Sequence, residues 1–412
     1  MMPIDNRAAR VRDQIEMLAS VSEHHQYVQR TFCSLAAKLA NDMVSGWMHA
    51  AGLKTRVDNM ANLRGVLPGN NPQGRVFVMG SHLDTVIDAG KYDGPLGVLL
   101  AIDQAARLEA GSLPFDLEVI GFSDEEGVRY HSSYLGSSVV AGCFDQEQLS
   151  LKDAKGVSMQ QAVEKFGGDV TKLSKDQIPK DKFLGYFEAH IEQGPVLEEK
   201  NIPVGVVQTI NSQERVEIKV QGVPGHAGTT PMMIRKDALA GAALMIAEVE
   251  QLAQKDHENM VATVGKVDVF PGASNVIPGN VNFTLDLRSP NYERLSTFSK
   301  KLQQIFSGIT QKRGLTYSWN LIKTNKSTPC DDQLTQILSE AISQAGYPVQ
   351  ALTSGAGHDA VAISNLGPVA LMFIRCRNGI SHHPDEFVAT EDIGAAIKVC
   401  DVFFDKLSQQ MQ

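Results

Sequence analysis

The sequence predicts an α/β fold in which a larger domain is interrupted by a smaller inserted one. Short apolar strands alternate with helical stretches in the first half of the chain, a different order of elements follows between 211 and 325, and the alternation then resumes. At 412 residues the chain also exceeds the roughly 250 to 300 residues that one hydrophobic core usually supports. We therefore expect a discontinuous domain, 1–210 and 326–412, and an inserted domain, 211–325.

The first half of the chain has the pattern of a parallel sheet covered by helices. Residues 34–52 have the apolar spacing of a helix and end at a glycine. Apolar strands follow at 75–80, 116–123 and 186–192, and the pattern of 96–111 predicts a helix between the first two. Strands joined through helices form parallel sheets, and ligands gather at the carboxyl ends of such strands.

The middle of the chain is organised differently. We expect strands at 214–222, 260–270, 280–288 and 315–323 and helices at 235–255 and 292–314. This βαββαβ order is that of the ferredoxin-like unit, which is large enough for a small independent domain. The larger domain then resumes with a helix at 334–346, the loop TSGAGHDA, a strand at 369–376 and a final helix at 392–407.

Composition and charge argue against two classes of partner. The formal net charge is -9 and no block of basic residues appears, so we expect no nucleic-acid surface, which needs concentrated Lys and Arg. No apolar run approaches the ~20 residues of a membrane span, and the N-terminus lacks an apolar signal segment. The five cysteines form no CxxC pair, which fits a reducing compartment. We expect a cytoplasmic protein without membrane partners.

Side chains that carry chemistry stand at the ends of three predicted strands. The stretch GSHLDTVIDAGKYDG places a histidine and aspartates after the first strand, DEEG follows the second, and a histidine lies near the end of the third. In chain order these positions are His82, Asp84, Asp93, Asp124, Glu125, Glu126 and His190. A polar loop, a catalytic His/Asp pair and one corner of a metal site would each explain the first stretch.

The adjacent carboxylates of DEEG favour the metal interpretation. Three acids in a row usually mark a solvated loop, but directly after an apolar strand their repulsion needs compensation, which a divalent cation supplies. Further histidines stand at strand ends or in glycine-rich loops: His226, His358, His382 and His383. Because His, Asp and Glu are the ligands of hydrolytic zinc and manganese centres, these residues predict a metal centre.

Other hydrolytic and nucleotide-binding classes have little support. The chain has no GxSxG nucleophile elbow, no GxGxxG fingerprint and no GxxxxGK[ST] loop. A cysteine nucleophile at Cys376 is less expected than a buried thiol at a strand end.

Seven motifs, in their order along the chain, resemble the dinuclear-metal amidohydrolases of the M20 metallopeptidase clan. They are GSHLDT, KYDG, DEEG, AHIEQGPVLE, GHAGTTPM, SGAGHDA and GISHHPDE. The resemblance runs from about residue 60 to the C-terminus and points to the branch of N-carbamoyl-L-amino acid hydrolases, allantoate amidohydrolases and β-ureidopropionases. It implies a zinc-peptidase-like α/β catalytic domain, with the inserted domain as lid and dimerisation domain of a homodimer.

The resemblance also implies a ligand set. Two divalent ions per subunit, zinc or manganese with cobalt as a further candidate, would be held by His82, Asp93, Glu126, His190 and His382. Asp93 would bridge the two ions. Glu125 would be the general base that activates the attacking water, and Asp84 would orient His82.

Most of the implied substrate contacts fall in the inserted domain. By resemblance, His226 stabilises the developing oxyanion, reaching the active site of the partner subunit. Arg288 takes the substrate carboxylate, because a planar guanidinium pairs bidentately with a carboxylate. The further implied contacts are Gln213, Asn275, Gly357 and His358.

The implied reaction is hydrolysis of the ureido C–N bond of a carboxylate-bearing small molecule, allantoate or an N-carbamoyl-L-amino acid, with release of ammonia and carbon dioxide. A metallo-aminopeptidase or dipeptidase is the alternative, and peptidase members more often place an acid where His190 stands. A binding protein that has lost its activity is a third candidate. Relatives often carry Asn at position 383, so we assign the ligand to His382 by motif position. Segment 144–184 matches no motif.

Overall fold

The computed structural model describes residues 2–411, which divide into two compact units. The first contains the residues up to Gln208 and from Cys330 onward, and the second is Thr209–Pro329. The predicted inserted domain, 211–325, lies within the second unit. Within the described residues, no helix combines the length and the apolar character that crossing a bilayer requires.

The first unit is built on a large mixed sheet. In residues 2–411 this sheet has nine strands in the order β1-β2-β4-β3-β5-β16-β6-β14, with β15 beside β6. The strands are β1 Lys54–Val57, β2 Leu63–Leu67, β3 Val76–His82, β4 Asp116–Phe122, β5 Phe183–Ile191, β6 Val204–Ile210, β14 Thr328–Pro329, β15 Ala351–Ser354 and β16 Val369–Ile374. Of these, β14 and the last two residues of β6 fall within the range Thr209–Pro329. The neighbours β4, β3, β5 and β16 run parallel, as strands connected through helices do.

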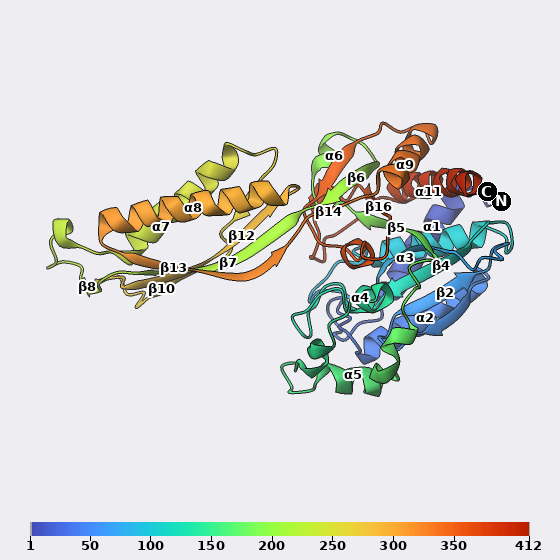
Figure 1. Ribbon diagram of the computed structural model, residues 1–412, viewed down its shortest axis with the longest axis horizontal. Helices are drawn as coiled ribbons and strands as arrows, with labels where there is room; N and C mark the ends of the chain where they lie inside the picture. The colour runs from blue at the N-terminus through green and yellow to red at the C-terminus, as the bar shows by residue number, and fades with distance from the viewer. Residues whose placement is uncertain (1, 412) are drawn as a thin grey trace. The chain divides into compact units, whose positions relative to one another are not determined.

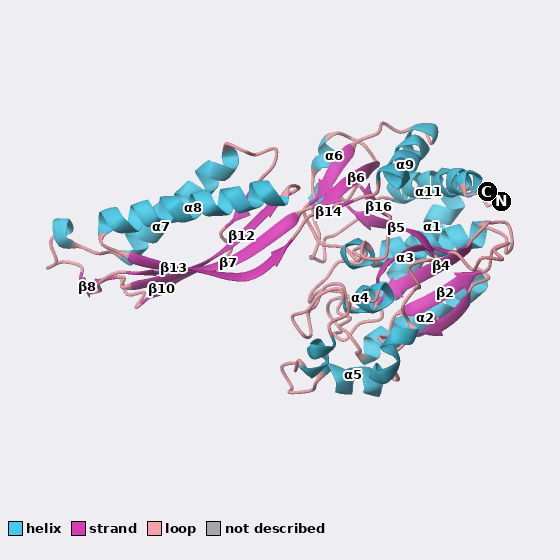
Figure 2. Cartoon of the chain, in the orientation of Figure 1, coloured by secondary structure: helices cyan, strands magenta, loops and turns pink. Residues whose placement is uncertain are grey.

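Helices alternate with these strands along the chain (Figure 1 and Figure 2). They are α1 Ile4–Ala19, α2 Leu35–Ala50, α3 Pro95–Arg107, α4 Leu135–Ala141, α5 Met159–Phe166, α6 Val196–Glu199, α9 Asp332–Gln344, α10 Ala360–Ile363 and α11 Thr390–Gln410. Helices α1, α3 and α9 all pack on α11, and α3 also packs on β3 and β4. The main core lies between this helix layer and the sheet. The N-terminal helix α1 is an element that the sequence patterns above did not predict.

The second unit is an antiparallel sheet with two long helices. Thr209–Pro329 contain a five-stranded sheet of order β10-β12-β7-β13, with β9 also paired to β12. Its elements are β7 Ser212–Gln221, β8 Gly225–His226, α7 Ala238–Gln254, β9 Val261–Thr263, β10 Val267–Phe270, β11 Val276–Ile277, β12 Asn280–Ser289, α8 Tyr292–Arg313 and β13 Thr316–Asn325. Helices α7 and α8 pack on each other and on the sheet, enclosing a separate core (Figure 1).

One predicted strand, 260–270, is wrong as a single element. It forms β9 and β10, which pair with different parts of β12: β9 lies against 286–288 and β10 against 280–283. The ladder is interrupted at 264–266, where Gly265 lies in an exposed irregular stretch. A glycine has little tendency to continue a strand, because it loses more conformational entropy and has no side chain to pack.

Segment 144–184 forms a satellite of the first unit. It contains the 3₁₀ turns Gln146–Ser150 and Val170–Lys175 and the helix α5. A small apolar core joins it to Phe32 and Tyr130, whose rings meet edge to face with centroids 6.2 Å apart.

Candidate metal centre

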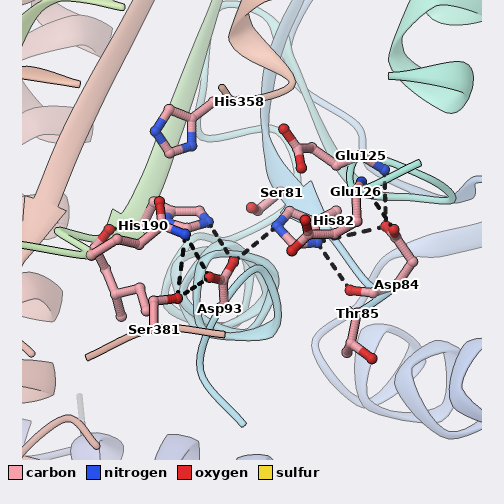
Figure 3. A network of polar contacts seen from close by, with 12 residues as sticks. Ser81, His82, Asp84, Thr85, Asp93, Glu125, Glu126, His190, His358 and Ser381 are labelled. Carbon is pink, nitrogen blue, oxygen red and sulfur yellow. Dashed lines mark hydrogen bonds and ion pairs between the residues drawn. The ribbon is translucent and has the colours of Figure 1, made fainter. Parts of the chain in front are cut away.

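The predicted ligands converge at the carboxyl ends of adjacent parallel strands. His82 ends β3 and His190 lies near the end of β5, while Glu126 follows β4 and His382 follows β16. Asp93 lies in the loop between β3 and α3. Because neighbouring parallel strands end at the same edge of the sheet, side chains from distant parts of the chain meet there (Figure 3).

A first metal position is formed by His82, Asp93 and His190. Asp93 Oδ1 lies 3.3 Å from His82 Nε2 and 3.2 Å from His190 Nε2. The other ring nitrogen of each histidine faces a backbone carbonyl, at 3.0 Å from Asp84 O and 2.9 Å from Ile191 O. When each Nδ1–H donates to its carbonyl, the Nε2 lone pairs face the carboxylate. Lone pairs opposed in this way need a cation or protons between them, so these residues fit a metal ion.

A second metal position is formed by Asp93, Glu126 and His382. His382 Nε2 lies 3.2 Å from Glu126 Oε1 and 3.5 Å from Asp93 Oδ2. Within each position the candidate ligand atoms lie within 4.8 Å of one another, and both positions include Asp93. The neighbouring His383 instead lies 3.6 Å from Asp385 and belongs to none of the candidate ligand groups among the described residues.

The two positions differ in burial. The side chains of His82 and His190 are 2% exposed, whereas the side chain of His382 is 48% exposed. The first position is therefore fixed by two strands of the sheet, and the second depends on a partly solvated loop.

The acidic side chains around His82 and His190 favour a positive charge at the centre of the site. Burial opposes protonation of His82, yet its hydrogen bond with Asp93 and the charges of Asp84 and Glu125 raise its pKa well above the usual value. Burial also opposes ionisation of Asp93, but the two histidines hold its pKa well below the usual value. Protons on the histidines thus supply the charge that a divalent ion would supply.

Metal binding at the second position is expected to depend on pH. The hydrogen bond with Glu126 raises the pKa of His382 to about 9, and this proton must leave before the imidazole can bind an ion. Below that pKa the proton competes with the ion, so the affinity for Mn²⁺ should rise by up to about tenfold per pH unit and level off above it. Titrations of the metal-stripped chain at several pH values measure this slope. An affinity that is constant between pH 6.5 and 9 would show that His382 is not a ligand.

Asp84 and Glu125 are linked through the backbone. The Asp84 carboxylate accepts hydrogen bonds from the amides of Glu125 and Glu126, at 3.0 and 3.1 Å. Its nearest carboxylate oxygen is 3.6 Å from His82 Nδ1, farther than its own carbonyl oxygen. Asp84 therefore contacts the predicted ligand mainly through its backbone and anchors the loop that carries Glu125. Burial and the charge of Glu126 raise the pKa of Glu125 well above the usual value, as suits a proton acceptor.

Gly94 lets the Asp93 loop approach the sheet. Gly94 has a φ of +84° and directly precedes the helix α3, which begins at Pro95. A Cβ at Gly94 would lie 2.5 Å from the His82 ring. Only glycine combines this backbone conformation with this clearance.

The residues predicted to contact substrate from the inserted domain lie in the second unit. Arg288 on β12 donates to Asp286 from Nε at 2.8 Å, and Gln213 donates to the same carboxylate at 2.8 Å. His226 lies on β8, is exposed and accepts a hydrogen bond from a nearby amide at its Nδ1. Asn275, also exposed, precedes β11, the strand that pairs with β8. The sequence does not predict Asp286 as the partner of Arg288 and Gln213, because the position of Asp286 on a strand does not show which side chains it contacts.

Gly357 and His358 lie in the loop after β15. His358 is fully buried, hydrogen-bonds Ser354 Oγ at 2.8 Å and packs edge to face on His190, with ring centroids 4.6 Å apart. Burial and the positive charge of His190 lower its pKa well below the usual value, so the ring is neutral. A Cβ at Gly357 would collide with the hydroxyl of Tyr134.

Three further residues, which the motifs did not single out, hold Asp93 and its loop in place. Gln193 Nε2 donates to Asp93 Oδ2 at 2.6 Å, and the Ser381 hydroxyl contacts the same oxygen (Figure 3). The carboxylate of Glu386 accepts hydrogen bonds from the backbone amides of Tyr92 and Asp93. These residues lie within AHIEQG and GISHHPDE, but a sequence pattern does not show which oxygen each side chain contacts.

Comparisons with known proteins agree with this site. Residues 78–405 match the family described as peptidase family M20/M25/M40. Allantoate deiminase from Arabidopsis thaliana is 39% identical over 424 residues, covering 95% of this chain and 80% of the relative. N-carbamoyl-L-amino-acid amidohydrolase from Pseudomonas sp. (strain NS671) is 36% identical over 398 residues, covering 95% of this chain and 96% of the relative.

A solved structure has the same fold over nearly the whole chain. An amidase of the hydantoinase/carbamoylase family from Burkholderia multivorans aligns with a TM-score of 0.89 and 31% identity, covering 96% of this chain and 97% of that one. The mixed α/β architecture is thus shared with this amidase.

Proposed function

Because the chain belongs to peptidase family M20/M25/M40, we propose that it is a hydrolase that cleaves the ureido C–N bond of a carboxylate-bearing small molecule. The substrate class is allantoate or an N-carbamoyl-L-amino acid, as the names of the relatives suggest. The observation that carries the proposal is the pair of candidate metal positions that share Asp93 beside Glu125. The cofactors are two divalent ions per subunit, zinc or manganese, with cobalt as a further candidate.

The reaction requires one proton acceptor that later becomes a donor. Bound divalent ions would polarise the ureido carbonyl and lower the pKa of water. Glu125 takes a proton from the attacking water and gives it to the departing nitrogen, so the C–N bond to the terminal amino group breaks and ammonia leaves. The remaining carbamate takes up a proton and releases carbon dioxide and the amine. The anchoring of the Glu125 amide by Asp84 supports this role.

We propose that the second unit is a ferredoxin-like lid and dimerisation domain. Its sheet and helices, in the order β7, α7, β10, β12, α8 and β13, support that classification. Its substrate contacts are assigned to Gln213, His226, Asn275 and Arg288, and His226 serves the active site of the partner subunit. Light scattering should report a homodimer. A chain that is active as a monomer would contradict the role of His226 in the partner's site.

Arg288 is expected to set the affinity for the substrate carboxylate. Asp286 accepts from Arg288 at 2.8 Å and from Arg215 at 3.2 Å, so the two arginines share one partner. Replacing Arg288 with Lys removes the bidentate fork and should raise KM about 10- to 100-fold, with a smaller change in kcat. Arg215→Lys is the matched control and should leave KM nearly unchanged. Equal effects of both variants would assign the loss to Asp286 rather than to the substrate.

The direct test of the function is a screen for ammonia release. The substrates are allantoate, N-carbamoyl-β-alanine and several N-carbamoyl-L-amino acids, each with the metal-stripped chain and after addition of Mn²⁺ or Zn²⁺. We expect metal-dependent ammonia release from at least one of them. Cleavage of dipeptides without ammonia release from any ureido compound would identify a peptidase instead.

A further inference from the structure

We propose that Glu386 is a positioning residue that couples Asp93 to the loop carrying His382. By this coupling it sets the affinity of the second metal position more than that of the first. The inference rests on the proposed function, because it assumes that both positions bind divalent ions.

The Glu386 carboxylate joins two loops. One oxygen accepts hydrogen bonds from the amides of Tyr92 and Asp93, at 2.7 and 3.0 Å. The other oxygen lies 3.1 Å from Ser381 Oγ, and the hydroxyl of Ser381 also contacts Asp93 Oδ2. The side chain is buried, with the whole residue 3% exposed. A single carboxylate therefore holds the backbone of the Asp93 loop and the residue next to His382.

The backbone before Asp93 packs closely against Glu386. A Cβ at Gly90 would collide with the Glu386 carboxyl group, so the loop before Asp93 lies directly against it. Glu386 is thus fixed on one side by the backbone of this loop and on the other by Ser381.

The two positions depend on this link to different extents. His82 and His190 lie on β3 and β5, and a backbone carbonyl orients each ring. His382 instead lies in a loop, has a φ of +56° and exposes 48% of its side chain. Its neighbour Ser381 ties this loop to Asp93 Oδ2, the oxygen nearest His382. Loss of Glu386 should therefore release the loop ligand and leave the strand ligands in place.

Mn²⁺ titration of the metal-stripped full-length chain tests this inference. Free Mn²⁺ is followed by electron paramagnetic resonance, and thermal unfolding first confirms that each variant is folded. In Glu386→Ala the affinity for the second ion should fall about 10- to 100-fold, while that for the first ion changes by less than about 3-fold. Glu386→Gln keeps an oxygen that accepts from both amides, and it should recover most of the affinity for the second ion.

Glu192 provides the matched control. Its carboxylate also accepts from two backbone amides, those of Val196 and Leu197 at 2.8 and 2.9 Å, but these begin α6 and do not belong to a ligand loop. Glu192→Ala should bind both ions like the wild type.

Three results would overturn the inference: unchanged binding in Glu386→Ala, an equal loss at both positions, or a Glu386→Gln variant as weak as Glu386→Ala. If the wild-type chain binds only one ion, the two-ion function itself is contradicted, and the inference with it.

Discussion

Glu125→Gln is expected to lower kcat by about 10²- to 10⁴-fold while both ions remain bound. The amide has nearly the same shape as the carboxylate but accepts no proton at neutral pH. Burial and the charge of Glu126 raise the pKa of Glu125, so its carboxylate binds a proton more strongly than an exposed glutamate does. The fall in kcat should therefore appear without a comparable change in metal content, which metal analysis after dialysis measures.

The competing role for Glu125 is that of a ligand. His82, Glu125 and Glu126 also form a group whose candidate ligand atoms lie within 4.8 Å of one another. Glu126→Gln serves as the comparison, because it should lose the ion at the second position. If Glu125→Gln loses an ion as readily as Glu126→Gln does, Glu125 is a ligand and the general base must be another residue.

Replacing Asp93 with Ala is expected to remove both ions and to abolish turnover. Its two oxygens face different positions, Oδ1 toward His82 and His190 and Oδ2 toward His382. The loss of affinity at each position should exceed the roughly 100-fold that removal of a hydrogen-bond partner of a ligand can cost. Metal analysis and calorimetric titration with Mn²⁺ measure both positions separately.

Two histidine variants make this prediction specific. His382→Ala should lose only the ion at the second position. His383→Ala should keep both, because His383 lies beside Asp385 and outside the candidate ligand groups found in residues 2–411. Retention of one ion by Asp93→Ala would contradict a shared carboxylate. Loss of an ion in His383→Ala would move the ligand assignment by one residue.

The sequence by itself determined the alternation of strands and helices and the residues that the structure brings together at the sheet edge. Apolar strands such as β3 are buried along most of their length, which gives a strong pattern, and parallel strands end at one edge. The sequence therefore predicts that His82 and His190 lie close together. The break between β9 and β10 was missed because an apolar pattern does not show where a strand changes its pairing.

Only the tertiary structure decided how these residues contact one another. The orientation of His82 by the Asp84 carbonyl, the partnership of Arg288 with Asp286, and the link from Glu386 to Asp93 depend on the geometry of single hydrogen bonds. The strength of a hydrogen bond changes when the distance between donor and acceptor changes by a few tenths of an ångström, and it also depends on the angle at the donor. The identity and spacing of residues specify the chemistry available at an edge of the sheet, whereas the packing of several loops fixes which oxygen faces which nitrogen.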